Sequence, residues 1–135
     1  MDKLKITLIF LYLFKLFNFD LVLFIPKITF VKGFNVSDKL SDSLEINVSR
    51  AKIIFGHSGY GTNSYFNNLV KLRRGNKIYF IDKKIYTYEV VFIKSFNKGS
   101  KITLDNNEKY LYLITCDINN LETKQVIIGS KLVKN

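Results

Sequence analysis

A succession of short β-favouring segments, separated by gaps of turn length, restricts the fold of this chain more than any other feature. The segments are rich in Ile, Val, Tyr and Phe, and most of the later gaps are short enough for hairpins. They occupy residues 25–31, 52–55, 77–82, 84–96, 101–104, 109–116 and 124–133. A chain of 135 residues is expected to form one domain. So many strands within it predict a mainly β fold, a small closed or nearly closed barrel of antiparallel strands rather than a parallel α/β sheet.

One stretch between these segments has helical spacing instead. Apolar residues recur three and four positions apart between residues 65 and 72. Capping residues precede this stretch, and two cations and a glycine follow it: Thr62, Asn63 or Ser64 at the start, and Arg73, Arg74 and Gly75 at the end. The pattern therefore predicts one or two short helices beside the strands.

An apolar run begins the chain. From residue 4 to residue 25, 17 of 22 positions are apolar, Lys3 and Lys5 lie at the start of the run, and no small-residue cleavage site follows it. This pattern predicts an uncleaved membrane anchor at residues 1–24, with the barrel at residues 25–135 on the outer side of the membrane.

Two charges within the run point to an alternative. Lys15 and Asp20 interrupt the apolar residues, and a charge near the centre of a membrane helix costs about 2.5–3.5 kcal/mol on the insertion scale. A helix that ends before Asp20 is also short for the hydrocarbon layer. The alternative is that residues 16–25 already form the first buried strand.

The net charge restricts the class of partner. The chain carries 21 basic and 11 acidic residues, a formal charge of +10, which can indicate a nucleic acid or an anionic membrane. Only three basic residues are arginines, the side chains that suit bidentate recognition of phosphate and guanine. We therefore expect no nucleic-acid partner. A basic β-barrel that binds single-stranded nucleic acid stays a remote alternative, with four tyrosines either stacking on bases or packing in the barrel: Tyr86, Tyr88, Tyr110 and Tyr112.

The single histidine and the single cysteine both lie where a β-favouring segment ends. His57 stands between Gly56 and Ser58 after an apolar segment, and Cys116 closes the segment at residues 109–116. A lone cysteine is either a small buried hydrophobe or a reactive thiol. A histidine next to a cysteine in the fold makes the thiol a nucleophile. The spacing alone leaves both interpretations open, because any chain with one residue of each type offers such a pair.

Three stretches of the sequence resemble the sortase family of cysteine transpeptidases. IIFGHS at residues 53–58 is similar to the family's histidine motif, an apolar strand that runs into Gly-His-Ser. YFNNLVKLRRGNKIYF at residues 65–80 is similar to the aromatic helix, basic segment and Ile-Tyr strand that follow in sortases. YLITC at residues 112–116 is similar to the family's Thr-Leu-x-Thr-Cys motif, with Tyr112 in place of the first threonine. The histidine also precedes the cysteine, and the resemblance covers about residues 25–133.

This resemblance implies an eight-stranded β-barrel, carried by a membrane anchor outside the cell of a monoderm bacterium. It also implies a thiol transpeptidase. Cys116 would attack the Thr–Gly bond of a Leu-Pro-x-Thr-Gly-like sorting signal, and His57 would protonate the leaving amine. An amine of a cell-wall precursor or a pilin lysine would then resolve the thioester. Thr115 and Lys124 are expected to contact the substrate.

The sequence departs from the family at one functional position. Sortases carry an arginine on the last strand, just before its apolar run, that helps to hold substrate and to stabilise the oxyanion. The aligned residue here is Gln125, which we expect to take this role because it keeps register with the apolar run and can donate a hydrogen bond. Loss of one oxyanion donor costs about 2.7–4 kcal/mol, which predicts a slow enzyme. The alternative is a degenerate sortase-like domain that binds peptides with little or no turnover. Arg73 and Arg74 are weaker candidates for the role.

An acidic cluster is a further candidate for a metal site. Asp38, Asp42 and Glu45 lie where some sortases could hold calcium. Their spacing fits no calcium-binding loop, and a solvated loop is the simpler interpretation. We therefore expect no metal and no other cofactor.

Overall fold

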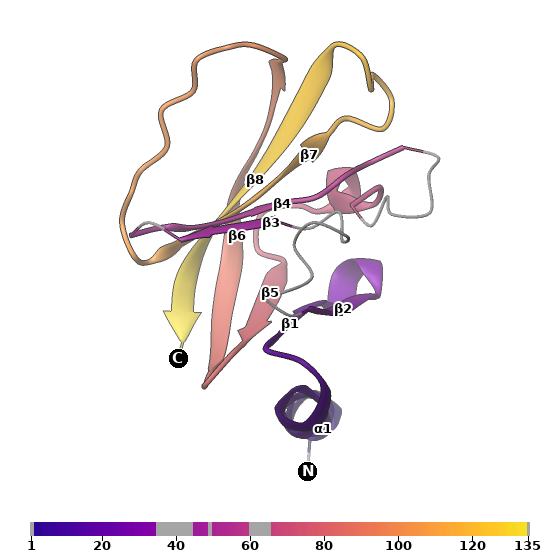
Figure 1. Cartoon of the computed structure of the whole chain (residues 1–135), viewed down its shortest axis with the longest axis vertical. Helices are drawn as coiled ribbons and strands as arrows, with labels where there is room; N and C mark the ends of the chain where they lie inside the picture. Colours follow the sequence, from indigo (N-terminus) through magenta and orange to yellow (C-terminus); the bar gives the residue numbers. More distant parts are fainter. Residues whose placement is uncertain (1, 35–44, 49, 60–65, 135) are drawn as a thin grey trace.

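The computed structural model describes residues 2–34, 45–48, 50–59 and 66–134, in which one α-helix accompanies a single sheet of eight strands (Figure 1). The elements are α1 (Lys3–Asn18), β1 (Leu21–Ile25), the 3-10 turn η1 (Pro26–Ile28), β2 (Phe30–Phe34), β3 (Glu45–Val48), β4 (Lys52–Phe55), the 3-10 turn η3 (Leu69–Lys71), β5 (Lys77–Ile81), β6 (Ile85–Asn97), β7 (Tyr110–Cys116) and β8 (Lys124–Lys134). Across the sheet the strands follow the order β2-β1-β5-β6-β8-β7-β4-β3. The prediction of a mainly β fold is confirmed.

The sheet is curled but not closed. Strand β6 pairs with β5 on one side and β8 on the other, and its register with β8 shifts between Thr87 and Tyr88 and between Val90 and Phe92. Such irregularities bend a strand and increase its twist. Among the described strands β2 and β3 each have one neighbour. The architecture is therefore a curled half-barrel, more open than the closed or nearly closed barrel predicted from the sequence.

The main core lies on one face of this sheet. Alternate residues of β7 and β8 point into it, among them Leu111, Leu113, Val126 and Ile128. Phe66 and two leucines from the η3 segment cover it and are fully buried: Leu69 and Leu72. Each such side chain contributes roughly 1.5–3 kcal/mol through burial. The η3 segment therefore closes the core at the place where the sequence predicts a helix.

That predicted helix is shorter than its spacing suggests. Its candidate caps at residues 62–64 lie outside the described residues. The described remainder forms a turn at residues 66–68 and then η3. Arg73 ends the segment as expected, since its Nη1 donates to the carbonyl oxygens of Val70 and Leu72 at 3.0 and 2.8 Å.

The strand prediction fails for two segments, in part for residues 25–31 and entirely for residues 101–104. Residues 25–31 are divided, because Pro26 starts η1 and Thr29 then takes a left-handed backbone (φ 51°) that turns the chain back into β2. Residues 101–104 form no strand, and their apolar side chains pack on the sheet from a loop. Strand β3, in contrast, was not predicted.

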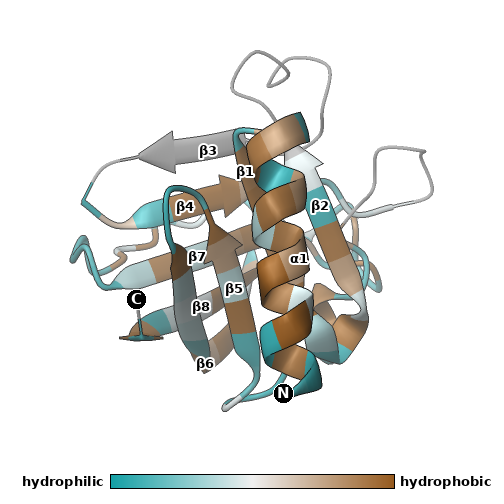
Figure 2. Cartoon of the chain, turned by 90° about the horizontal axis from the view of Figure 1, so that it is seen from below, coloured by the Kyte–Doolittle hydropathy of each residue, from teal (hydrophilic) through white to brown (hydrophobic). Residues whose placement is uncertain are grey.

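The N-terminal apolar run forms a helix and then a strand. Helix α1 lies against the sheet beside β1 and β5 (Figure 2). Leu11 packs with Val22 and Ile81 in a small apolar cluster. No helix in the described ranges combines the length and the apolar character needed to cross a membrane. The sheet starts at Leu21 rather than at Ile25, so the strand lies within residues 16–25, the alternative considered for this run.

Candidate active site

The two motif-bearing segments meet because β4 and β7 are neighbouring parallel strands. Ile53 is in register with Tyr112, and Phe55 with Ile114. This parallel pair corrects the expectation of an entirely antiparallel sheet. Strand β6 ends level with the end of β7, and the connection at residues 98–109 returns the chain to the edge where β7 begins. Parallel strands end at one edge, so the residue that follows β4 lies beside the end of β7. The Gly56 N–H donates to the Ile114 carbonyl at 3.0 Å and extends this contact by one residue.

His57 stands directly after this contact. Its carbonyl oxygen accepts a hydrogen bond from the Phe66 N–H at 3.1 Å, and its side chain is exposed. The backbone of His57 is thus held between the end of β7 and the η3 segment, while the imidazole is open to solvent and to a substrate.

The residues that flank the histidine and the cysteine are joined by a side-chain hydrogen bond. Ser58 Oγ and Thr115 Oγ1 lie 2.6 Å apart, and Thr115 is only 2% exposed. A second link holds the next residue: the Gly59 N–H donates to Asn67 Oδ1 at 2.7 Å, and Asn67 Nδ2 donates to the Gly59 carbonyl at 2.8 Å. The turn after β4 is therefore fixed on both sides of the site.

Neither of these two contacts was predicted from the sequence. Ser58 belongs to the Gly-His-Ser motif, so its position after the histidine was a usable signal. No local pattern marks Asn67.

Cys116 is the last residue of β7 and is half-buried, with a free thiol. It is directly opposite Gln125 on β8. Residues opposite each other in an antiparallel pair share one face of the sheet, with Cβ atoms about 4.5–5.5 Å apart. Lys124 precedes Gln125 and therefore points to the other face; its carbonyl accepts from the Asp117 N–H at 3.0 Å. Register thus places Gln125, rather than Lys124, beside the thiol.

A cluster of apolar side chains lies next to Cys116 on the same face of the sheet. Ile114 on β7 and Ile127 on β8 are buried there, and Ile102 and Leu104 from the β6–β7 connection pack onto them in one cluster. Tyr112 holds this connection in place by donating to the Asp105 carbonyl at 2.8 Å. The half-buried thiol therefore lies at the end of an apolar cluster that the β6–β7 connection covers.

The remaining candidate residues lie elsewhere. The Gly75 N–H donates to the carbonyl oxygen of Val90, and Val90 is paired with Ser130 on β8. Ser130 is five residues from Gln125 along this strand, so the two residues are about 17 Å apart. The segment that carries Arg73 and Arg74 is therefore bound to the sheet far from Gln125, which occupies the position of the family arginine.

The tyrosines and the acidic cluster were the other candidates. Tyr88 and Tyr112 are fully buried and pack in the molecule, so they are not open for base stacking. Asp38, Asp42 and the side chain of Glu45 lie outside the described residues. Within the described part, no three His, Cys, Asp or Glu side chains gather as a metal site.

Comparisons with known proteins agree with this geometry. A family model described as the sortase domain matches residues 44–133. Sortase C-1 from Actinomyces oris has a TM-score of 0.67 at 20% identity, covering 85% of this chain and 74% of that one. Sortase A from Listeria monocytogenes has a TM-score of 0.66 at 23% identity, covering 86% and 88%. Sortase C1 from Streptococcus agalactiae has a TM-score of 0.65 at 23% identity, covering 84% and 67%. No curated protein matches the chain. The family match, which spans more than half of the chain, and the shared fold show that the chain belongs to the sortase family.

Proposed function

We propose that this protein is a sortase-type cysteine transpeptidase with Cys116 as nucleophile and His57 as general acid and base. The observation that carries the proposal is the joining of the two motifs at one sheet edge, through the Gly56 to Ile114 hydrogen bond and the pair Ser58 and Thr115. A thiol and an imidazole at adjoining strand ends are the minimum apparatus for acyl transfer through a thioester.

The reaction runs in two balanced steps. The Cys116 thiolate attacks the carbonyl carbon between Thr and Gly of a Leu-Pro-x-Thr-Gly-like sorting signal, the C–N bond breaks, and His57 gives a proton to the departing glycine amine. An amine of a cell-wall precursor or a pilin lysine then attacks the thioester and gives its proton to His57, the C–S bond breaks, and the Cys116 thiolate is restored. The Gln125 amide would donate to the oxyanion in both steps, and its register opposite Cys116 supports this role.

Two further residues have supporting parts in this proposal. The buried Thr115 holds Ser58, and with it the turn that carries His57. Lys124, which points to the other face, would reach the substrate only at its rim. No cofactor takes part in this chemistry.

The location also follows from the family. Sortases are generally cell-surface enzymes, and we extend this location to the present chain. A single-pass anchor with the catalytic domain outside the cell stays a prediction.

The test is covalent capture of the acyl-enzyme. The full chain is incubated with a Leu-Pro-x-Thr-Gly peptide, with and without an acceptor amine, and its intact mass is measured. We expect an adduct on the wild type that disappears in Cys116→Ala and is consumed when the amine is added. Absence of the adduct from the wild type, or its survival in Cys116→Ala, contradicts the mechanism.

A second candidate function is peptide binding with little or no turnover. The glutamine in place of the family arginine favours it. Gln125→Arg separates the two, because a restored cationic donor opposite Cys116 should raise the acylation rate of a slow enzyme. Lys124→Arg is the matched control, since it adds the same side chain on the other face and should leave the rate unchanged. If Gln125→Arg leaves the acylation rate unchanged or lowers it, another group is the oxyanion donor.

A further inference from the structure

The turn after β4 is held by a side chain that imitates a neighbouring strand. Asn67 Oδ1 accepts from the Gly59 N–H at 2.7 Å, and Asn67 Nδ2 donates to the Gly59 carbonyl at 2.8 Å. In an antiparallel sheet, two residues exchange the same pair of hydrogen bonds through their peptide groups. Gly59 is buried and has a φ of 145°, a backbone that residues with a side chain rarely adopt. The Asn67 amide thus satisfies both backbone groups of a buried residue that lies beyond the end of β4.

The chemistry of this contact requires an amide side chain. One end of the side chain must accept and the other must donate, and the two backbone groups of Gly59 determine which end does which. An aspartate side chain lacks the donor, and an alanine side chain lacks both groups. Either substitution at residue 67 leaves a backbone group of the buried Gly59 without its partner, which is unfavourable.

Asn67 can hold Gly59 because the core fixes the residues around Asn67. Phe66 and Leu69 are fully buried in the main core, and the Phe66 ring packs on the ring of Phe30 in β2, with 5.5 Å between the ring centroids. The Phe66 N–H also donates to the His57 carbonyl at 3.1 Å. The backbone at residues 57 and 59 is therefore bonded to two consecutive residues that the core holds in place.

The position of the imidazole depends on this backbone. Within the part of the chain that the structure describes, the exposed ring of His57 makes no hydrogen bond or ion pair of its own. A misplacement of about 1 Å can lower the rate of an enzyme about a hundredfold. We propose that Asn67 is a positioning residue for His57, which holds the turn after β4 so that the imidazole stays at the shared edge of β4 and β7. This inference rests on the proposed function, in which His57 transfers the proton.

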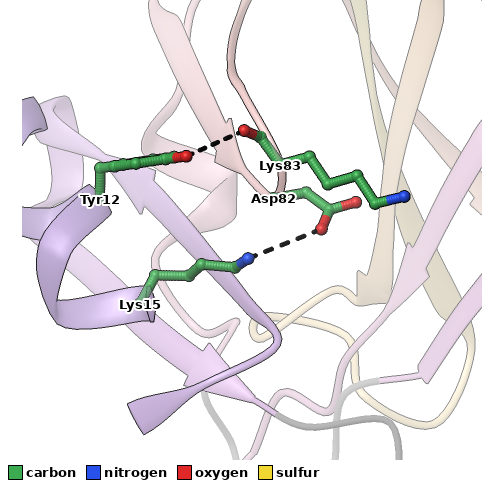
Figure 3. Close-up of polar contacts among 4 residues, drawn as sticks. All are labelled: Tyr12, Lys15, Asp82 and Lys83. Carbon is green, nitrogen blue, oxygen red and sulfur yellow. Dashed lines mark hydrogen bonds and ion pairs between the residues drawn. The ribbon is translucent and has the colours of Figure 1, made fainter. Parts of the chain in front are cut away.

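A contact of similar kind at the far end of the sheet supplies a control (Figure 3). Tyr12 donates from its hydroxyl to the Lys83 carbonyl at 3.1 Å, beside an ion pair in which Lys15 Nζ lies 3.9 Å from Asp82 Oδ1. These contacts hold helix α1 to the turn between β5 and β6. Strand β6 separates that turn from the edge that carries Cys116. Tyr12→Phe therefore removes a hydrogen bond from a side chain to the backbone without touching the site.

Steady-state kinetics separates positioning from stability. The full chain is assayed with a Leu-Pro-x-Thr-Gly peptide and an acceptor amine. In Asn67→Ala we expect kcat to fall by about tenfold to a hundredfold, with KM within about twofold of the wild-type value, because the contacts with substrate remain. Asn76→Ala is the matched control, since Asn76 Oδ1 accepts from the Arg73 N–H at 2.8 Å at the other end of the same segment. Asn76→Ala and Tyr12→Phe should lower the urea midpoint and leave kcat unchanged.

Two results of these assays overturn the proposal. The first is an equal kcat in Asn67→Ala and Asn76→Ala, and the second is a rise in KM with kcat unchanged. If Asn67→Ala does not fold, Asn67→Asp takes its place, because the carboxylate still accepts from the Gly59 N–H and loses only the second hydrogen bond. A wild-type kcat in Asn67→Asp then overturns the proposal.

Nuclear magnetic resonance tests the positioning without turnover. The chain contains one histidine, so labelling with ¹⁵N-histidine gives a single backbone amide signal, that of His57. The heteronuclear Overhauser effect of this signal reports motion on the ps–ns timescale. We expect a lower value in Asn67→Ala than in the wild type, and no change in Asn76→Ala. An unchanged value in Asn67→Ala overturns the proposal even where the wild type forms an acyl-enzyme. A lower value in a chain that forms no acyl-enzyme contradicts the proposed function alone, because Asn67 then still holds the turn.

Discussion

The two ends of strand β4 use their polar side chains in opposite ways. At its start Lys52 donates from Nζ to the Tyr88 hydroxyl at 3.3 Å, and the same Nζ lies 5.4 Å from the Phe80 ring and 5.1 Å from the Tyr86 ring. Beyond its end, His57 contributes its backbone carbonyl to the fold while its ring stays exposed. The first end uses its side chain for packing. The second end is held by the backbone and by neighbouring side chains, which leaves the imidazole free for chemistry.

The largest expected effect comes from His57→Ala. We expect the rate of transpeptidation to fall by about 10²–10⁴, because a positioned acid and base is lost. The free energy of unfolding should change by less than about 0.5 kcal/mol, because the ring is exposed. Peptide turnover and urea denaturation measure the two quantities. A large loss of stability would show that this end of β4 is also maintained by side-chain packing, which contradicts the comparison.

The converse substitution is Tyr88→Ala at the other end. Tyr88 is fully buried between β5 and β8, and removal of a large aromatic side chain costs about 3–5 kcal/mol. The folded fraction should keep its acylation rate, because Cys116 and His57 lie at the opposite edge. Denaturation and single-turnover acylation at low temperature check this pair of outcomes. A rate that falls as far as in His57→Ala would mean that the two ends are coupled.

Alkaline pH gives a smaller effect at the same end. Burial, together with the neighbouring Tyr86, raises the pKa of Tyr88 to about 12, above the usual 10. The folded state therefore keeps the tyrosine proton more tightly than the unfolded state. Stability from this group is complete below pH 10 and is lost between about pH 10 and 12, by about 1.4 kcal/mol for each pH unit. Urea midpoints at several pH values measure the slope, and Tyr88→Phe should flatten it. An equal slope in Tyr88→Phe would assign the effect to another group.

The smallest expected effect concerns the hydrogen bond between Ser58 and Thr115. Ser58→Ala and Thr115→Val each remove it, and each should cost about 1 kcal/mol of stability and roughly tenfold in kcat with little change in KM. The double variant should lose little more than either single one, because both remove the same contact. Additive losses in kcat would show that the two hydroxyls act separately.

The sequence predicted the strands that are rich in Ile, Val, Tyr and Phe and are bounded by turn residues. Strands β4, β5, β6, β7 and β8 begin and end within about one residue of the expected bounds. Ile102 and Leu104 come from a similar segment but belong to a loop, because the strands on which they pack, β7 and β8, already pair with a neighbour on each side. The parallel pairing of β4 and β7 was not predicted, since it depends on the path of the intervening chain rather than on local pattern.

The candidate site was predictable to a similar degree. His57, Cys116 and Gln125 were identified from motifs and register, and the structure brings all three to one edge of the sheet. The hydrogen bond between Ser58 and Thr115 joins residues that are 57 positions apart, and no local sequence pattern predicts such a contact. The N-terminal run was ambiguous for a physical reason: an apolar helix with one charge suits a membrane, and it equally suits a helix whose charge pairs with Asp82.

The shared direction of β4 and β7 has a consequence for how such a protein can diversify. The chain leaves both strands at the same edge, so the loops that surround the thiol are all extensions of fixed strand ends. Insertions into these loops would change the surroundings of Cys116 without altering the pairing of β4 with β7, which holds the backbone of His57 at the same edge. The loops that surround the thiol and the strand pairing that places the histidine motif can therefore change independently in evolution.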